Sequence, residues 1–141
     1  MKEPYFSWDP ETGHAICLIQ DGNATYYGTA KCAPDDKDMM SEKTGCEIAW
    51  TRANISYMQK QKEKVRYQIE ALQHYKSTVL QSKTLIIDDN VDYLFRRLNK
   101  EIYNLRQEHY ELQSQIDVAK TRLREYIKDK DTFYKKIREK R

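Results

Sequence analysis

With 141 residues, a third of them charged and only 39% apolar, the chain is too short and too polar to build a large globular core. Its net charge of +3 is unevenly divided, because residues 1–50 carry −5 (four Lys and Arg against nine Asp and Glu) and the remainder carries +8 (21 against 13). The small net charge disfavours a dedicated duplex-DNA binder. The basic helical part suits anionic ligands, which can be nucleotides, nucleic acid or the acidic face of another protomer.

The N-terminal part of the chain predicts a three-stranded antiparallel meander. We expect strands at 5–8, 15–19 and 25–29, where aromatic, β-branched and aliphatic residues gather. The segments DPETG at 9–13 and DGN at 21–23 have the composition of tight turns. Three strands are barely stable alone, so one face of this sheet needs a helix or a second sheet against it.

A first long helix is predicted after the sheet. It can begin near Asp36, with the carboxylate of Asp35 or Asp36 as the N-cap, although Thr44-Gly45 is able to break or kink it. Its apolar stripe is interrupted by Lys62 and Lys76. The apolar positions follow the 3–4 spacing of a helix face, at Ile55, Met58, Val65, Ile69, Leu72 and Val79.

A second long helix shows the strongest pattern in the chain. It follows a connection at 82–90 that includes Leu85-Ile86-Ile87, and its N-cap is expected at Asp88, Asp89 or Asn90. One heptad register then runs through fourteen positions, of which twelve are apolar: Val91, Phe95, Leu98, Ile102, Leu105, His109, Leu112, Ile116, Ala119, Leu123, Tyr126, Lys130, Phe133 and Ile137. A strict seven-residue repeat keeps one stripe facing a partner helix, so this is a coiled-coil seam.

These elements predict an α+β protein. A small antiparallel β cap at 1–34 precedes a coiled-coil-like helical hairpin at 35–141, which forms a single structural unit with the cap. The seam of the first helix is the shorter one, so the apolar length toward Ile137 is expected to meet another copy in a homo-oligomer through the helices. Three cysteines without C-x-x-C spacing are expected to be free thiols in a reducing cytoplasm. No apolar run is long enough for a membrane span, and none follows Met1 as a signal peptide requires.

Catalytic and metal-binding patterns are absent from the sequence. There is no phosphate-binding glycine loop, no nucleophile elbow and no H-E-x-x-H motif, and His14, His74 and His109 are far apart. The acidic segment at 35–38 lacks the spacing of a calcium loop and is better interpreted as a helix cap. We therefore expect a binding protein without a cofactor or a metal, and not an enzyme.

A candidate binding surface lies on one face of the second helix, outside its seam. The spacing i, i+3, i+7, i+10 and i+14 places five residues on this face: Arg96, Asn99, Tyr103, Arg106 and Tyr110. Arginine grips phosphate with two parallel hydrogen bonds, and tyrosine rings stack on a base or a sugar. The alternative is a solvated flank whose tyrosines pack under a neighbouring helix.

Part of the sequence resembles a known family. The segments CAPDDKD at 32–38 and SEKTG at 41–45, followed by Ile48-Ala49 and Arg52-Ala53, are similar to the first-described Thoeris anti-defence family of phage proteins. The order of parts, a short β cap and then long helices in about 140 residues, is also similar. The resemblance implies a molecular sponge in the host bacterial cytoplasm. Such proteins bind the cyclic ADP-ribose isomer made by TIR-domain immune enzymes, in some members also cyclic oligonucleotides, and sequester it without cleaving it.

The resemblance also implies the composition of the binding site. In the family the ligand lies between protomers, held by arginines, an asparagine and an aromatic ring. Residues of these types occur here as Phe95, Asn99 or Asn104, Arg106, Arg122 and Arg124, and Arg52 near the start of the first helix is a further candidate. The competing hypothesis is a coiled-coil phage or plasmid protein that binds DNA or a host protein, and a structural adaptor without a small ligand is a third.

Overall fold

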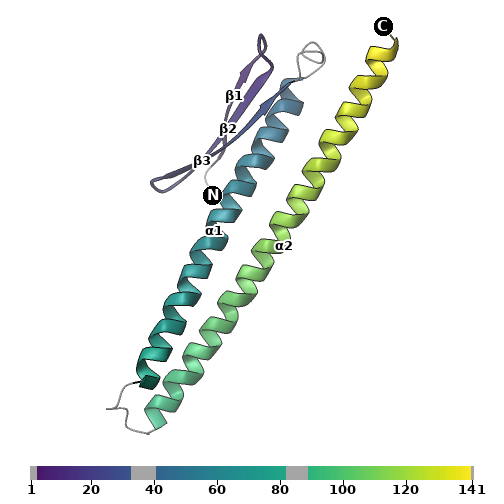
Figure 1. The fold of residues 1–141 in the computed structure, drawn as a ribbon. Helices are drawn as coiled ribbons and strands as arrows, with labels where there is room; N and C mark the ends of the chain where they lie inside the picture. The colour runs from purple at the N-terminus through teal and green to yellow at the C-terminus, as the bar shows by residue number, and fades with distance from the viewer. Residues whose placement is uncertain (1–2, 33–40, 82–88, 141) are drawn as a thin grey trace. The chain divides into compact units, whose positions relative to one another are not determined.

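The computed structural model describes residues 3–32, 41–81 and 89–140 of the chain (Figure 1). It contains three strands followed by two long helices, the α+β arrangement that the sequence predicts. In chain order these elements are β1 (Tyr5–Asp9), β2 (His14–Asp21), β3 (Ala24–Lys31), α1 (Glu42–Gln81) and α2 (Asp89–Lys140). Within the described ranges, no helix is both long and apolar enough to cross a membrane.

The three strands form one antiparallel sheet in the order β1-β2-β3, which confirms the predicted meander. The register pairs Cys17 of β2 with Phe6 on one side and with Gly28 on the other. Each turn holds a glycine with a positive φ, 71° at Gly13 and 61° at Gly22, a conformation that side chains with a Cβ avoid. Gly22 opens the two-residue loop between β2 and β3, where a positive φ at the first position matches a type II′ turn.

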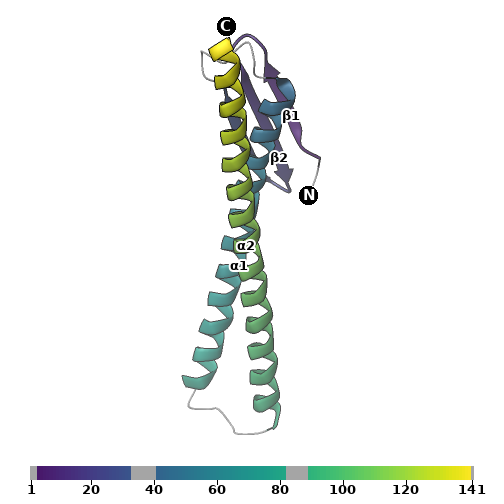
Figure 2. The same cartoon turned by 90° about the vertical axis from the view of Figure 1, so that its right-hand side faces the viewer.

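One face of the sheet forms the core with the beginning of α1. Along β2 the side chains of Ala15, Cys17 and Ile19 are fully buried, while the residues between them are exposed or half-buried. Figures 1 and 2 show the sheet lying along the first turns of α1. The same hydrophobic cluster includes residues of α1, namely Ile48, Ala49 and Ala53. The sheet thus has the helical cover that its small size requires.

Gly28 brings β3 into direct contact with the backbone of α1. A Cβ built on Gly28 would lie 2.1 Å from the carbonyl oxygen of Ala49 and 2.4 Å from the amide nitrogen of Ala53. Only a residue without a side chain allows this approach. The small side chains of Ala49 and Ala53, one helical turn apart, bring the helix backbone close to the strand.

α1 begins at Glu42, which is later than the start predicted near Asp36. The N-cap is Ser41, whose Oγ accepts a hydrogen bond from the amide of Thr44 at 3.1 Å. The predicted break at 44–45 is wrong, because these residues lie in the first turn, where glycine weakens a helix least. The proposed caps Asp35 and Asp36, the acidic segment at 35–38 and residues 82–88 of the predicted connection lie outside the described residues. Asp89 and Asn90, predicted as caps of the second helix, lie within α2 instead.

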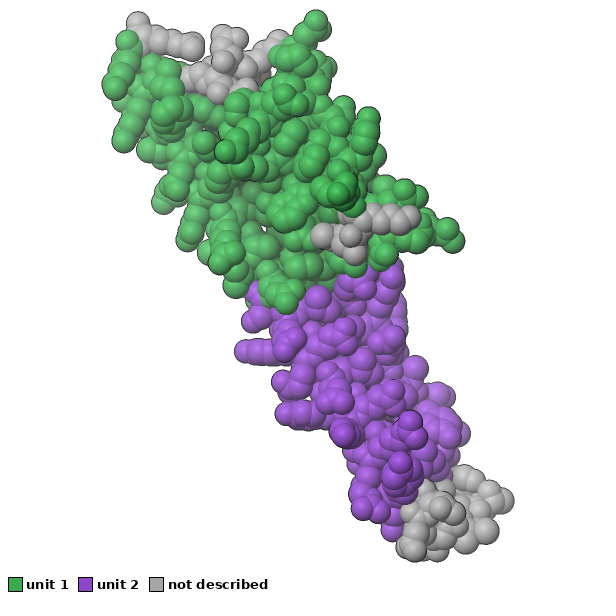
Figure 3. Space-filling view, turned by 180° about the vertical axis from the view of Figure 1, so that it is seen from behind, with its two compact units in different colours: residues 1–58, 115–141 green, residues 59–114 purple. Residues whose placement is uncertain are grey.

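The chain divides into two compact units, shown in green and purple in Figure 3. Unit 1 comprises residues 1–58 and 115–141, and unit 2 comprises residues 59–114. Both helices therefore contribute to both units. In unit 1, Ile55 and Met58 of α1 pack against Ile116 of α2 in a second small hydrophobic cluster.

In unit 2, lysines as well as apolar side chains hold α1 and α2 together. Among the described residues of unit 2, the buried aliphatic side chains are Val65, Leu98 and Ile102. The two lysines that interrupt the apolar stripe of α1 each reach an amide oxygen on α2: Lys62 Nζ donates to Gln113 Oε1, and Lys76 Nζ donates to Asn99 Oδ1 at 2.6 Å. Since an amide is neutral, each contact satisfies one N–H donor of the lysine but does not cancel the lysine charge.

The seam of α2 follows the predicted register except near its end. From Phe95 to Lys130 every predicted seam position is buried or half-buried. Phe133, however, is 55% exposed, and the next residue, Tyr134, is buried instead, so the prediction is wrong at Phe133. Tyr134 follows the buried Ile116 by 18 residues (134 minus 116), which is five full turns at 3.6 residues each. The stripe here follows the straight helix rather than the heptad repeat, which drifts by about 20° per heptad.

Candidate functional site

The predicted site residues fall into separate surface features. Arg122 lines a groove in unit 1, and Arg52 lines a smaller cavity of about 180 Å³ in the same unit. Asn99, Tyr103 and Arg106 line a groove in unit 2. Each groove or cavity therefore contains its own set of predicted site residues.

The larger feature, here named the Trp50 groove, has a volume of about 540 Å³. Each helix lines it with four residues at i, i+3, i+4 and i+7, the spacing of one helical face. The lining residues are Glu47, Trp50, Thr51 and Asn54 from α1, and Ala119, Arg122, Leu123 and Tyr126 from α2. Its size falls within the range of small-molecule sites, and its aromatic content is typical of them.

The floor of the Trp50 groove is apolar and continuous with the core. Leu123 and Tyr126 line the groove and also pack against the hydrophobic cluster beneath the sheet. Burial raises the pKa of the Tyr126 hydroxyl, and its hydrogen bond to the Glu47 carboxylate acts in the same direction. The ammonium of Lys130 lies 5.5 Å from the centre of the Tyr126 ring. These contacts fix the position of the Tyr126 ring in the groove.

The rim of the groove carries the polar groups. Trp50 is 37% exposed, so part of its indole faces solvent at this surface. Arg122 is exposed, and in the described part of the chain it forms no ion pair within 4.0 Å. Asn54 is half-buried on the opposite helix. A concave surface with two aromatic rings, one guanidinium and one amide can hold a flat ring and an anionic group at the same time.

The groove in unit 2, here named the Asn99 groove, has a volume of about 340 Å³. Three of the five residues predicted as a binding stripe line it, together with Gln73, Lys76 and Ile102. The Lys76 ammonium, bonded to Asn99, and the Arg106 guanidinium make this groove basic. Tyr103 is 62% exposed and available for stacking.

The other predicted site residues lie outside both grooves. Phe95 is half-buried in the seam, and Arg96 donates from Nε to the carbonyl of Asp92 at 3.5 Å. Asn104 is exposed, and so is Arg124, which donates from Nη2 to Thr121 Oγ1 at 3.3 Å.

Arg52 is held against the sheet. Its Nη1 donates to the carbonyl of Thr29 at 2.7 Å. In the small cavity that it lines, Lys31, Lys130 and Asp131 are the other charged residues. Arg52 is thereby fixed beside β3, apart from the residues of the Trp50 groove.

Sequence reasoning missed Trp50, Asn54 and Glu47, and assigned Tyr126 to the seam alone. The available signal was the repeated i, i+3, i+4, i+7 spacing at 47–54 and at 119–126. The spacing does not predict that these two helix faces lie opposite each other. That depends on how far one helix is shifted along the axis of the other.

Among the described residues there is no group of three or more His, Cys, Asp or Glu side chains placed to hold a metal ion. Comparison with known protein families, with curated proteins and with solved structures finds no match for this chain.

Proposed function

We propose that this chain is a non-catalytic binding protein that sequesters a small phosphorylated nucleotide. The ligand is of the cyclic ADP-ribose type that the resemblance to the Thoeris anti-defence family implies, captured in the cytoplasm of a bacterial host. The observation that carries the proposal is the Trp50 groove, where two aromatic rings and an arginine share one concave surface.

The groups in the groove match the parts of such a ligand. An adenine ring stacks on the exposed part of Trp50, and the Arg122 guanidinium takes two oxygens of the pyrophosphate. The Asn54 amide offers a donor and an acceptor to a ribose or to the base edge. Binding of this kind needs no nucleophile and no proton transfer, because the ligand is held and released unchanged.

The proposal includes self-association through the helices. A second copy would cover apolar surface that one chain leaves exposed, and it would add walls to the binding surface. Where unit 2 is described, its exposed large aromatic rings are those of Tyr67, Tyr75, Tyr93, Tyr103 and Tyr110, each between 49% and 70% exposed. Sedimentation of the purified protein at micromolar concentration tests this part, and a monomer would contradict it.

The experiment that tests sequestration is ligand recovery. The full chain is mixed with the product of a TIR-domain enzyme, separated from free ligand, and heated until it unfolds. We expect the intact cyclic nucleotide in the released fraction, and a thermal shift that corresponds to about 2.7 kcal/mol when the ligand is at 100 times its Kd. Recovery of a hydrolysed product would instead indicate an enzyme.

Two neighbouring arginines provide a matched pair of variants. Arg122→Ala is expected to weaken ligand binding at least tenfold, because a charge-assisted contact to phosphate is lost. Arg124→Ala removes the same charge two residues away, outside the groove, and is expected to leave binding unchanged. Equal weakening by both variants would show that only the net charge matters.

The competing function, binding to duplex DNA, has a different dependence on salt. Neutralising several phosphates makes duplex affinity fall steeply between about 50 and 200 mM salt. Tight, salt-sensitive duplex binding without nucleotide binding would replace the proposal.

A further inference from the structure

A fourth hollow, the His109 cavity, lies within unit 2 and combines charged groups that neither groove has. Its volume is about 440 Å³, and it is lined by Gln59, Lys62, Glu63 and Arg66 from α1 and by His109 from α2. The α1 residues have the i, i+3, i+4, i+7 spacing of one helical face. An ammonium, a guanidinium and an imidazole thus share one cavity with a single carboxylate.

The two cations of the cavity keep their charge available. Lys62 donates to the neutral side-chain oxygen of Gln113, so that contact orients the ammonium without cancelling its charge. Arg66 lies 3.9 Å from Glu70, with the two side chains 55% and 60% exposed. The guanidinium carbon also lies 5.3 Å from the centre of the exposed Tyr67 ring. Contacts of this length and exposure contribute little, so the guanidinium can exchange them for a stronger partner.

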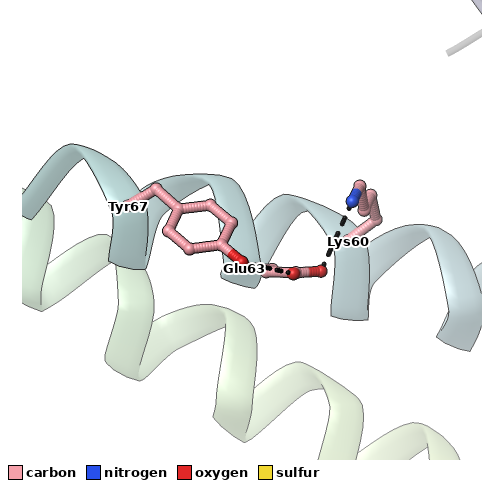
Figure 4. A network of polar contacts seen from close by, with 3 residues as sticks. All are labelled: Lys60, Glu63 and Tyr67. Carbon is pink, nitrogen blue, oxygen red and sulfur yellow. Dashed lines mark hydrogen bonds and ion pairs between the residues drawn. The ribbon is translucent and has the colours of Figure 1, made fainter.

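The carboxylate of Glu63 is held by groups that do not line the cavity (Figure 4). Tyr67 donates from its hydroxyl to Oε1 at 3.0 Å, and Lys60 Nζ lies 3.4 Å from Oε2. The hydrogen bond from Tyr67 and the charge of Lys60 lower the pKa of Glu63, so the group is ionised. Its negative charge is offset by Lys60 and, to a smaller extent, by Arg66, so Lys62, the rest of the Arg66 charge and the His109 imidazole face a ligand.

We propose that the His109 cavity binds the phosphoryl group of a ligand that has no aromatic base. A tetrahedral anion accepts hydrogen bonds from several directions, which an ammonium, a guanidinium fork and an imidazole N–H supply together. The lining residues in the described part include no Trp, Tyr or Phe side chain, in contrast to the Trp50 groove. The ligand class is therefore a phosphorylated polar molecule, or phosphate itself, with Gln59 available to its polar body.

The test follows His109 by proton NMR while inorganic phosphate is added to the full chain at constant ionic strength. The chain has three histidines, His14, His74 and His109, so a His109→Gln variant assigns the resonance. We expect a saturable shift of the His109 ring protons at millimolar phosphate, and no comparable shift of the other two. Pyrophosphate and sulfate added in the same way distinguish a preference for phosphoryl groups from attraction of any anion.

Four variants separate a built site from diffuse charge. Lys62→Met and Arg66→Gln are each expected to weaken phosphate binding about tenfold. Lys64→Gln removes an exposed cation from the same helix outside the cavity and is expected to change little. Glu63→Gln removes the one carboxylate and is expected to strengthen binding. Arg66 is more than half exposed, so Arg66→Gln keeps the test valid even if Lys62→Met fails to fold.

Three results would overturn the proposal: no saturable shift of His109, equal responses to sulfate and phosphate, or equal losses in Arg66→Gln and Lys64→Gln. The outcome is independent of the proposed nucleotide site. Arg122→Ala acts on the Trp50 groove in unit 1 and is expected to leave phosphate binding at the His109 cavity unchanged.

Discussion

Gly28→Ala tests how the sheet is joined to α1. The added methyl group would lie 2.1 Å from the carbonyl oxygen of Ala49 and 2.4 Å from the amide nitrogen of Ala53. Both atoms belong to the helix backbone, so no side-chain rotation relieves the collision. To reach an ordinary contact of 3.4 Å, the helix must move away from the strand by about 1.3 Å (3.4 minus 2.1).

The size of the effect follows from that displacement. A gap of 0.5–1 Å already forfeits roughly a quarter to a half of a dispersion contact, and overpacking of a core typically costs about 1–3 kcal/mol. Because the obstacle is backbone, we expect a cost near the upper end, about 3 kcal/mol. Alanine also lowers the conformational entropy of the unfolded chain, which stabilises the folded state by roughly 0.4–1 kcal/mol relative to glycine. The net loss is therefore about 2 kcal/mol, or roughly 8 °C in Tm for a chain of this size.

Urea unfolding followed by circular dichroism measures this loss, at one protein concentration because association also adds stability. Gly22→Ala is the matched control. Gly22 has a positive φ of 61°, but a Cβ there meets no atom within 4 Å. This control therefore reports only the conformational cost of about 1–2 kcal/mol, reduced by the same unfolded-state gain. If Gly28→Ala is no less stable than Gly22→Ala, the inferred contact between β3 and α1 is wrong.

Three further predictions concern stability. Tyr26→Phe is expected to maintain stability or raise it by about 1 kcal/mol, because the buried hydroxyl has no hydrogen-bond partner among the described residues; a clear loss in urea unfolding would contradict this. Ile116→Ala is expected to cost about 2–5 kcal/mol and the exposed Phe133→Ala under about 0.5 kcal/mol, so equal costs would refute the assigned stripe. Burial raises the pKa of the Tyr126 and Tyr134 hydroxyls above 10.0, so the unfolded chain loses these protons first and stability is expected to fall above about pH 10. Urea midpoints that stay constant from about pH 9 to 11 would contradict that last expectation.

The fold was largely predictable because its signals are local. The turns at 9–13 and 21–23 contain glycines that take a positive φ, and the seam of α2 is a periodic pattern that needs no knowledge of the partner. The start of α1 was misplaced because several residues before Glu42 have suitable capping groups, and only the Ser41 hydrogen bond identifies the one used. Phe133 was misplaced because a heptad and a straight helix diverge over many turns.

The candidate sites were only partly predictable. Arginine, asparagine and tyrosine at helical spacing on α2 led to the Asn99 groove, whereas Arg122 became a candidate only through the family resemblance. The partner residues on α1, such as Trp50, were missed because the axial offset of two packed helices is not encoded in the period of either one. The His109 cavity was missed for a related reason, since a single histidine in a seam gives no sign of the cations that face it from the other helix.

Leu123 and Tyr126 pack against the hydrophobic core and also line the Trp50 groove. A substitution at either position therefore alters folding and recognition together. Arg122 and Asn54 stand at the edge of the same groove and are absent from the buried core. Substitutions at these two edge positions can therefore change ligand preference at little cost in stability. Substitutions at Leu123 or Tyr126 require compensating changes in the hydrophobic cluster beneath the sheet.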